Sequence, residues 1–338
     1  MNADLAVGWK AGVVSLGTLE KIAEQAGEDA VRDADLAGAV RLADELDRAA
    51  LIAIARTLRR HGLFTTPGYT YGLAEIYAAP RVAPRHRPIV RRWLDILVAE
   101  GLLTKGTAGY RRLADFSDAD LDHARRRITT AGAAVEHGPG FVRFFDTALA
   151  YLPELLRDEI DPWSLHFAAD MVDVHRRDVA GRYCAAAVAA LIADLVQEQG
   201  VGTEVVEVDG VTGYSPGRPA GTAEIVLVTD VLHDARHVGR ALTALRTLLA
   251  PGGILVFIET TREHYRTTTS TRFLLSPPAG TPSTGFADFR AGSDRMLPTA
   301  ADWRRELVVA GFEPLVCVPA EDHPLARFGQ HVIVGHAC

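Results

Sequence analysis

The chain has 338 residues, which is enough for two or three modules and a sizeable core. Its 48% hydrophobic and 23% charged residues are typical of a soluble globular protein, and its formal charge of −7 gives no reason to expect a nucleic-acid partner. The start, MNADLAVGWK, lacks the basic and apolar regions of a secretion signal, and no apolar run approaches about 18 residues. We therefore expect a cytoplasmic protein that has no membrane partner.

Residues 1–115 are predicted to form a helical N-terminal domain that contains a winged-helix-like module. Apolar positions over 36–60 repeat at helical spacing. Two shorter helices, over 70–79 and 84–100, precede a small hairpin over 102–113 whose turn contains two glycines. Modules of this shape bind DNA in some proteins. In an acidic chain with an enzyme-like second half we favour dimerisation or substrate capping instead.

Two further regions complete the predicted domain organisation. Residues 116–200 are expected to be a helical linker or cap, which ends in an Ala-rich helix over 182–199. Residues 201–338 are expected to be an α/β domain that begins with a strand over 204–208.

The stretch 224–261 predicts a strand, a helix and a second strand. EIVLVTDVL is a short apolar run with β-branched residues, and the following apolar positions, up to Leu249, have helical spacing. Pro251, Gly252 and Gly253 are expected to stop the helix before a buried strand over 254–258. Strands of such a βαβ unit are parallel, and ligands bind at their carboxyl ends.

The end of the chain predicts a lid and a closing element. Residues 262–299 are irregular and rich in Thr, Ser, Gly and Pro, and their length is that of a functional lid. TAADWRRELVVA, over 299–310, is a capped helix, and EPLVCVP and QHVIVGH are two final strands.

The order of these blocks resembles the S-adenosylmethionine (SAM)-dependent methyltransferases, and most closely the C-methyltransferase domains of polyketide and nonribosomal peptide synthases. The resemblance is carried by GLF (62–64), IVRRWLDILVAEGLL (89–103) and LPELLRDEIDPWSLHF (152–167), and by DVLHDARHVGRALTALRTLLAPGGILVFIETT and the closing TAADWRRELVVAGFEPL. It implies a Rossmann-like sheet that is mostly parallel with an antiparallel closing strand. Here the sheet is expected to be shortened.

The cofactor site is where the sequence departs from that family. The family binds SAM with a Gly-rich turn after the first strand, because missing side chains let the backbone approach the ligand. Here VVEV runs into Asp209, Gly210, Val211, Thr212 and Gly213, a degenerate form of that turn. Only about 15 residues separate this strand from EIVLV, too few for two further crossovers. We therefore predict a truncated, pseudo-methyltransferase-like chain that binds no cofactor.

The remaining chemistry is predicted to reside in a His-Glu dyad. In the related synthase domains a His and a Glu deprotonate the carbon that will be methylated, and His233 and Glu259 match those positions. An imidazole has a pKa near neutral, and a carboxylate can orient its second nitrogen. Asp230 is a further candidate for orienting the dyad, and His264 and Tyr265 are candidate donors to an enolate oxygen.

Three functions follow from this interpretation. The first is SAM-independent proton transfer next to a thioester carbonyl, giving epimerisation, isomerisation, elimination or cyclisation of an intermediate on an acyl- or peptidyl-carrier protein. The second is a SAM-dependent C- or O-methyltransferase with a remodelled cofactor site, and the third is a non-catalytic scaffold for a partner enzyme. A homodimer is possible. No metal is expected, because the three cysteines have no metal-ligand spacing and the HDARH stretch lacks the Glu of a metalloprotease motif.

Overall fold

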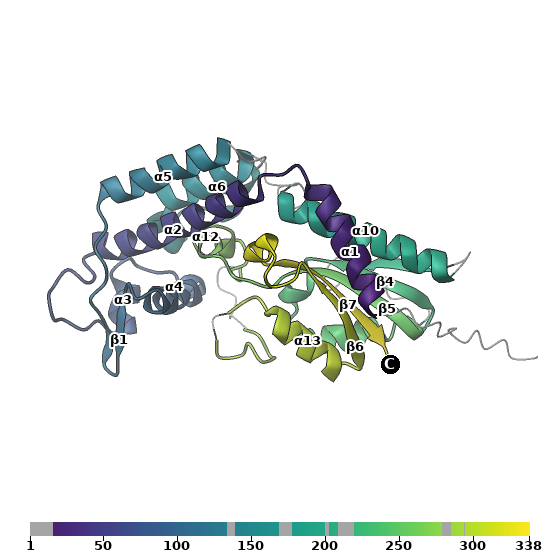
Figure 1. Cartoon of the computed structure of the whole chain (residues 1–338). Coiled ribbons are helices and arrows are strands. Elements are labelled where there is room, and N and C mark those ends of the chain that lie inside the picture. The colour runs from purple at the N-terminus through teal and green to yellow at the C-terminus, as the bar shows by residue number, and fades with distance from the viewer. Residues whose placement is uncertain are drawn as a thin grey trace, which may run out of the picture.

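The computed structural model describes residues 16–133, 139–168, 178–199, 203–208, 220–278, 285–293 and 295–338. A mainly helical half lies beside an α/β half, and the long helix α2 (Leu36–Arg60) runs through the helical half towards the other (Figure 1). A helical part and an α/β part are thus both present in this arrangement, as the predicted fold class requires.

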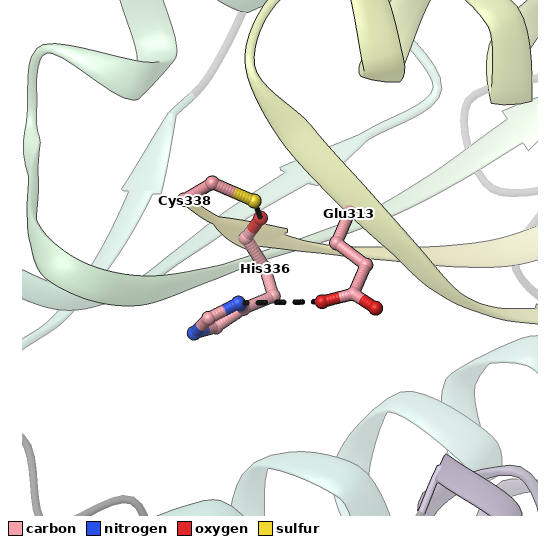
Figure 2. A group of neighbouring side chains, drawn as sticks. All are labelled: Glu313, His336 and Cys338. Carbon is pink, nitrogen blue, oxygen red and sulfur yellow. Dashed lines mark hydrogen bonds and ion pairs between the residues drawn. The ribbon is translucent and has the colours of Figure 1, made fainter.

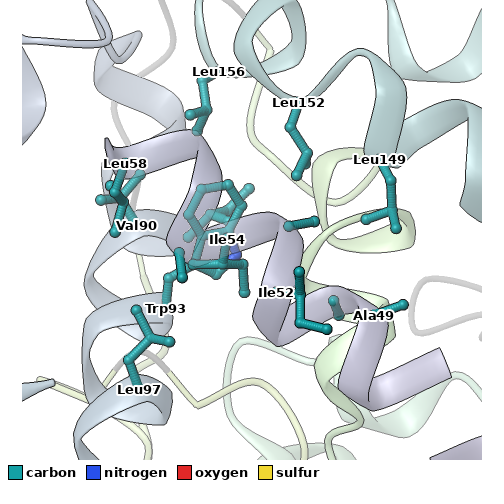
Figure 3. Close-up of a cluster of buried hydrophobic side chains, with 14 of the residues drawn as sticks. Ala49, Ile52, Ile54, Leu58, Val90, Trp93, Leu97, Leu149, Leu152 and Leu156 are labelled. Carbon is teal, nitrogen blue, oxygen red and sulfur yellow. The ribbon is translucent and has the colours of Figure 1, made fainter. Parts of the chain in front are cut away.

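The helical half is built on one buried cluster. Its elements are α2, α3 (Leu73–Ala78), the 3₁₀ turn η1 (Pro84–His86), α4 (Arg87–Ala99), β1 (Thr104–Gly106), β2 (Gly109–Arg111), α5 (Asp118–Ala133), α6 (Pro139–Ala150), α7 (Leu152–Leu156) and α8 (Pro162–Ala168). Figure 3 shows side chains of this cluster, with Ile54 of α2 and Trp93 of α4 near the centre and Leu152 of α7 above them. All three are fully buried. Burial of such side chains is the main contribution to the stability of this half.

The segment expected to be a winged helix contains the predicted elements. Helices α3 and α4 are followed by the antiparallel hairpin of β1 and β2, whose register pairs Lys105 with Tyr110. An isolated bridge joins Tyr71 to Tyr110, so the hairpin also contacts the chain before α3. The order of elements agrees with the prediction, and the winged-helix assignment itself stays a prediction.

The α/β half contains one five-stranded sheet. Its strands are β3 (Val205–Val208), β4 (Ala223–Thr229), β5 (Leu249–Thr260), β6 (Phe312–Val318) and β7 (Gln330–Ala337), in the order β3-β4-β5-β7-β6. Strands β3, β4 and β5 are parallel, and β7 is antiparallel to both of its neighbours. The sheet is therefore mostly parallel with an antiparallel closing strand, as predicted.

Helices cover both faces of this sheet. On one face lie α1 (Leu16–Val31) and α10 (Val179–Gln199), and on the other lie α11 (Val238–Arg246) and α13 (Ala300–Val309). Helix α10 is long and apolar enough to cross a membrane, but it packs against α1 and the sheet, as a core helix does. Because α1 and α10 share the core of the sheet, the predicted boundary at residue 200 does not separate the two packing units.

The βαβ unit differs from its prediction in where the helix stops. Helix α11 ends at Arg246, and β5 already begins at Leu249, so the Pro-Gly-Gly sequence lies inside the strand. Gly252 has a φ of 77°, a conformation that glycine adopts without strain, and the pairing of β4 with β5 shifts register there. The residues thus form an irregular strand start rather than a helix stop.

The irregular segment after β5 is anchored to the helical half. It contains the short helix α12 (Tyr265–Thr268) and the turn η3 (Thr271–Phe273). The indole nitrogen of Trp93 donates a hydrogen bond of 2.9 Å to the carbonyl of Thr268, and Phe273 is fully buried beside Trp93. This part of the predicted lid is therefore fixed to α4.

Replacing Trp93 by Ala tests that anchor. Loss of a fully buried indole should reduce the free energy of unfolding by about 3 to 5 kcal/mol, measured by chemical denaturation. Trp163 is 46% exposed, so Trp163→Ala is the matched control and should cost less than about 1 kcal/mol. Equal losses for the two variants would contradict the assigned core.

Candidate active site

The carboxyl ends of β4 and β5 bring the predicted dyad together. The two strands are parallel neighbours, and Thr229 at the end of β4 pairs with Ile258 of β5. After β4 the chain turns through Asp230, which has a φ of 49°, into the 3₁₀ turn η2 (Leu232–Asp234). His233 of this turn therefore faces Glu259, the penultimate residue of β5.

The His233 ring and the Glu259 carboxylate are directly hydrogen-bonded. Nδ1 of His233 lies 2.8 Å from Oε2 of Glu259. The other carboxylate oxygen, Oε1, accepts hydrogen bonds from the backbone N–H of Leu232 at 2.6 Å and of His233 at 3.3 Å. Glu259 has no exposed surface, and 12% of the His233 side chain is exposed. The arrangement holds the Nδ1 proton between the two groups and leaves Nε2 as the second titratable position.

The charges around His233 favour its protonated form. Burial lowers its pKa, but the hydrogen bond and charge of Glu259, with smaller effects of Asp230 and Asp234, raise it to about 9. Burial raises the pKa of Glu259, and His233 opposes that shift. The imidazole is thus a stronger base than an ordinary histidine.

Asp230 and Asp234 flank the dyad in different ways. Oδ1 of Asp230 lies 3.8 Å from Nδ1 of His233 and accepts hydrogen bonds from the backbone N–H and hydroxyl of Thr260, at 3.2 and 3.0 Å. The orienting role of Asp230 stays a prediction. Oδ1 of Asp234 lies 3.4 Å from Nε2 of His233, and that side chain is 44% exposed.

A buried arginine that sequence analysis missed holds the turn carrying His233. The guanidinium of Arg290 is 0% exposed, pairs with Asp288 at 2.7 Å, and donates to the carbonyls of His233 at 2.6 Å and Ala235 at 2.7 Å. Asp288 in turn accepts from the backbone N–H of Val238, at the start of α11. Arg290 is a positioning residue, and no spacing in the irregular segment 262–299 distinguishes it from other arginines.

The structure does not bring His264 and Tyr265 to the dyad. The ring nitrogens of His264 contact Asp47 at 3.2 Å and the carbonyl of Phe328 at 2.9 Å, and burial and Arg266 lower its pKa. Tyr265 donates its hydroxyl to Glu100 of the helical half, and burial and that bond raise its pKa to about 12. Both side chains join the two halves of the molecule, so these contacts give no support to the predicted donation to an enolate oxygen.

Two groups of side chains could hold a metal ion in the described part of the chain. One is Asp230, His233 and Glu259, but both oxygens of Glu259 already accept hydrogen bonds from the turn.

The second group is Glu313, His336 and Cys338, shown in Figure 2. The His336 ring lies 4.0 Å from the Glu313 carboxylate, and Glu313 and Cys338 are exposed. Because Ile254 pairs with His336 and Glu259 with His331, this group lies at the end of the sheet away from the dyad. It does not contribute to the candidate active site.

The predicted cofactor turn, Asp209, Gly210 and Gly213, lies outside the described residues. What the structure shows is its surroundings: β3 pairs only with β4 in the described sheet, and β4 follows it after the segment 209–222. On this side the described sheet ends at β3, and the expected absence of a cofactor stays a prediction.

Comparisons with known proteins identify the fold. No protein-family model matches the chain, and neither does any curated protein. Among solved structures, the CurJ carbon methyltransferase has a TM-score of 0.79 at 18% identity, over 95% of this chain and 99% of that chain. The DszA carbon methyltransferase has a TM-score of 0.71 at 17% identity, over 91% and 93%. The CMeT domain of the citrinin polyketide synthase has a TM-score of 0.68 at 12% identity, over 95% and 96%. The chain thus has the fold of carbon methyltransferase domains, which confirms the predicted resemblance at the level of fold.

The raised pKa of His233 predicts how stability depends on pH. A folded-state pKa of about 9, above the ordinary 6.5, means that the pair with Glu259 stabilises the fold fully below pH 6.5. That contribution is lost as the pH rises from 6.5 through 9. The difference in unfolding free energy between the parent protein and His233→Gln should therefore shrink over this range in denaturant titrations. A difference that grows with pH would contradict the assignment.

Replacing Arg290 by Met tests its positioning role. Removing one partner of a buried ion pair leaves Asp288 unpaired, which should cost about 3 to 5 kcal/mol of unfolding free energy. The control Arg240→Met changes an exposed arginine of α11 and should stay within about 0.5 kcal/mol. In the double variant Arg290→Met with Asp288→Asn the loss should be smaller than the sum of the two single losses, because the unpaired charge is gone.

Proposed function

We propose that the chain catalyses proton transfer at a carbon next to a thioester carbonyl, with His233 as the base and without SAM. The observation that carries this proposal is the 2.8 Å hydrogen bond between Nδ1 of His233 and the fully buried carboxylate of Glu259. Together with the two backbone donors on that carboxylate, it fixes the ring at the ligand edge of the sheet.

The proposed step uses Nε2 of His233. With Nδ1–H donated to Glu259, the neutral ring has its lone pair on Nε2, which accepts the proton from the substrate carbon. The electron pair of the broken C–H bond moves into the carbonyl and forms an enolate, while Glu259 stabilises the imidazolium. His233 then returns the proton to the same carbon or to its conjugated partner, giving an epimer or a shifted double bond. Asp230 and Arg290 position the ring and its turn.

The substrate is proposed to be carried on an acyl- or peptidyl-carrier protein. The support is the fold, which is that of domains described as carbon methyltransferases, one of them from a polyketide synthase. The helical half with its winged-helix-like hairpin would then serve as a cap over the substrate or as a dimer contact.

A second candidate function is SAM-dependent methyl transfer to carbon. Its support is the structural match to the CurJ carbon methyltransferase, which covers 99% of that chain. Deprotonation by His233 would be common to both functions, and only the fate of the enolate differs. The lone strand β3 beyond β4 in the described sheet is the reason that we prefer the first.

Hydrogen exchange in D₂O tests the proton transfer. The protein is incubated with β-ketoacyl and aminoacyl thioesters, and deuterium at the carbon next to the carbonyl is followed by mass spectrometry. Exchange should rise with pH as His233 loses its proton, with an apparent pKa of about 9. It should fall at least about a hundredfold in His233→Gln. In Glu259→Gln the apparent pKa should move down towards 6.5.

The matched control is His336→Gln, a histidine at the far end of the sheet, which should leave the exchange unchanged. Exchange that persists in His233→Gln would contradict the proposal. Micromolar SAM binding together with methyl transfer to the same carbon would replace the first function by the second. If a partner enzyme were stimulated equally by the parent protein and by His233→Gln, the chain would be a non-catalytic scaffold.

A further inference from the structure

A cavity of about 860 Å³ lies between the helical half and the irregular segment that follows β5. One wall is formed by η1 and the first turns of α4, over 84–91. On the opposite wall, the described lining residues lie within 272–278, 285–293 and 295–296. Arg290, which donates to the carbonyl of His233, belongs to this second wall. The cavity is therefore adjacent to the turn that carries the proposed base.

The charged side chains among the described lining residues are all cationic, and carboxylates outside the lining pair with three of them. No Asp or Glu is among its described lining residues, whereas six arginines are, namely Arg85, Arg87, Arg91, Arg272, Arg290 and Arg295. A concave surface lined by charges of one sign focuses the electrostatic potential and attracts ligands of the opposite sign. In a chain with a net charge of −7, this local excess of arginine is opposite to the overall balance.

Carboxylates outside the lining hold several of these arginines in place. Arg85 pairs with Asp158 at 2.6 Å and also donates to the carbonyl of Pro277, which joins the two walls. Arg295 pairs with Asp302 at 2.6 Å. These contacts fix the guanidinium groups before any ligand arrives, which reduces the entropy lost on binding.

Two further arginines lie on the wall formed by α4. Arg87 is exposed and lies with its guanidinium 5.4 Å from the centre of the Tyr77 ring, and Arg91 is exposed one turn further along α4. The lining between the charges includes Ile89, Leu275 and Phe286, which are apolar. The cavity therefore suits a ligand that combines an oxyanion with an uncharged chain.

We propose that this cavity binds the phosphate of a phosphopantetheine-type arm that carries the acyl thioester. Guanidinium groups bind phosphate oxygens by paired, charge-assisted hydrogen bonds, so arginines in the wall of a cavity suit a phosphate. That the arm carries a thioester rests on the proposed function. The same phosphate chemistry is present in a free coenzyme A ester and in the arm of a carrier protein.

Binding of three free probes tests the phosphate site. Pantetheine, 4′-phosphopantetheine and coenzyme A are titrated into the full chain by calorimetry, with inorganic phosphate as a competitor. The two phosphorylated probes should bind at least about tenfold more tightly than pantetheine, and their affinity should fall as salt rises. The variants Arg87→Gln and Arg91→Gln change exposed residues and should each remove most of that advantage. Arg236→Gln and Arg240→Gln are exposed and do not line the cavity, so they should retain it.

A second experiment separates the two sources of the arm and the two proposals. Deuterium exchange is compared for one acyl group on N-acetylcysteamine, on coenzyme A and on a phosphopantetheine-loaded carrier domain. Faster exchange with the coenzyme A ester or the carrier-bound ester than with the N-acetylcysteamine ester supports the phosphate site. The faster of the two shows which molecule supplies the phosphate. Equal exchange with the phosphate-free thioester, or equal binding of pantetheine and phosphopantetheine, would overturn the phosphate site and leave the proton-transfer proposal intact. Phosphate-dependent binding without any exchange would overturn only the proton-transfer proposal.

Discussion

Burial of the Glu259 carboxylate is the constraint on which the site depends. A charge that has lost all contact with water is stable in a fold only when it is paired and hydrogen-bonded. Glu259 meets that requirement through the His233 ring and two backbone N–H groups of η2. Because all three partners come from one short turn after β4, the end of β5 dictates the position of the proposed base.

The turn is held equally firmly from its other side. Arg290 donates hydrogen bonds to the carbonyl groups of His233 and Ala235. Its partner Asp288 accepts a hydrogen bond from the first backbone N–H of α11. One buried ion pair therefore contacts the backbone on both sides of the turn. The residues after β5 thus serve two purposes. Their first part fastens the helical half to the sheet through Thr268 and Trp93. A later part fixes the turn that carries His233 and lines the arginine-rich cavity.

Much of this arrangement follows from patterns in the sequence. Apolar periodicity located α2, α10 and α13, the strand-helix-strand order placed His233 and Glu259 at one edge, and the resemblance supplied the direction of the closing strand. The rest depends on contacts between distant residues. Nothing local indicates that α1 packs on the sheet, that His264 and Tyr265 bind Asp47 and Glu100, or that Arg290 is buried, because each depends on a partner supplied by the fold. The Pro-Gly-Gly sequence predicts a helix stop but lies in an irregular strand start, because β-strand irregularities and helix ends use the same residues.

Nitrogen-15 NMR of the His233 imidazole tests the central claim most directly. The account predicts that Nδ1 stays protonated towards Glu259 across the titration, while Nε2 loses its proton with a pKa of about 9. In Glu259→Gln the same titration should move towards the ordinary value of 6.5. A ring that titrates near 6.5 in the parent protein, or a neutral form that carries its proton on Nε2, would contradict the proposed base.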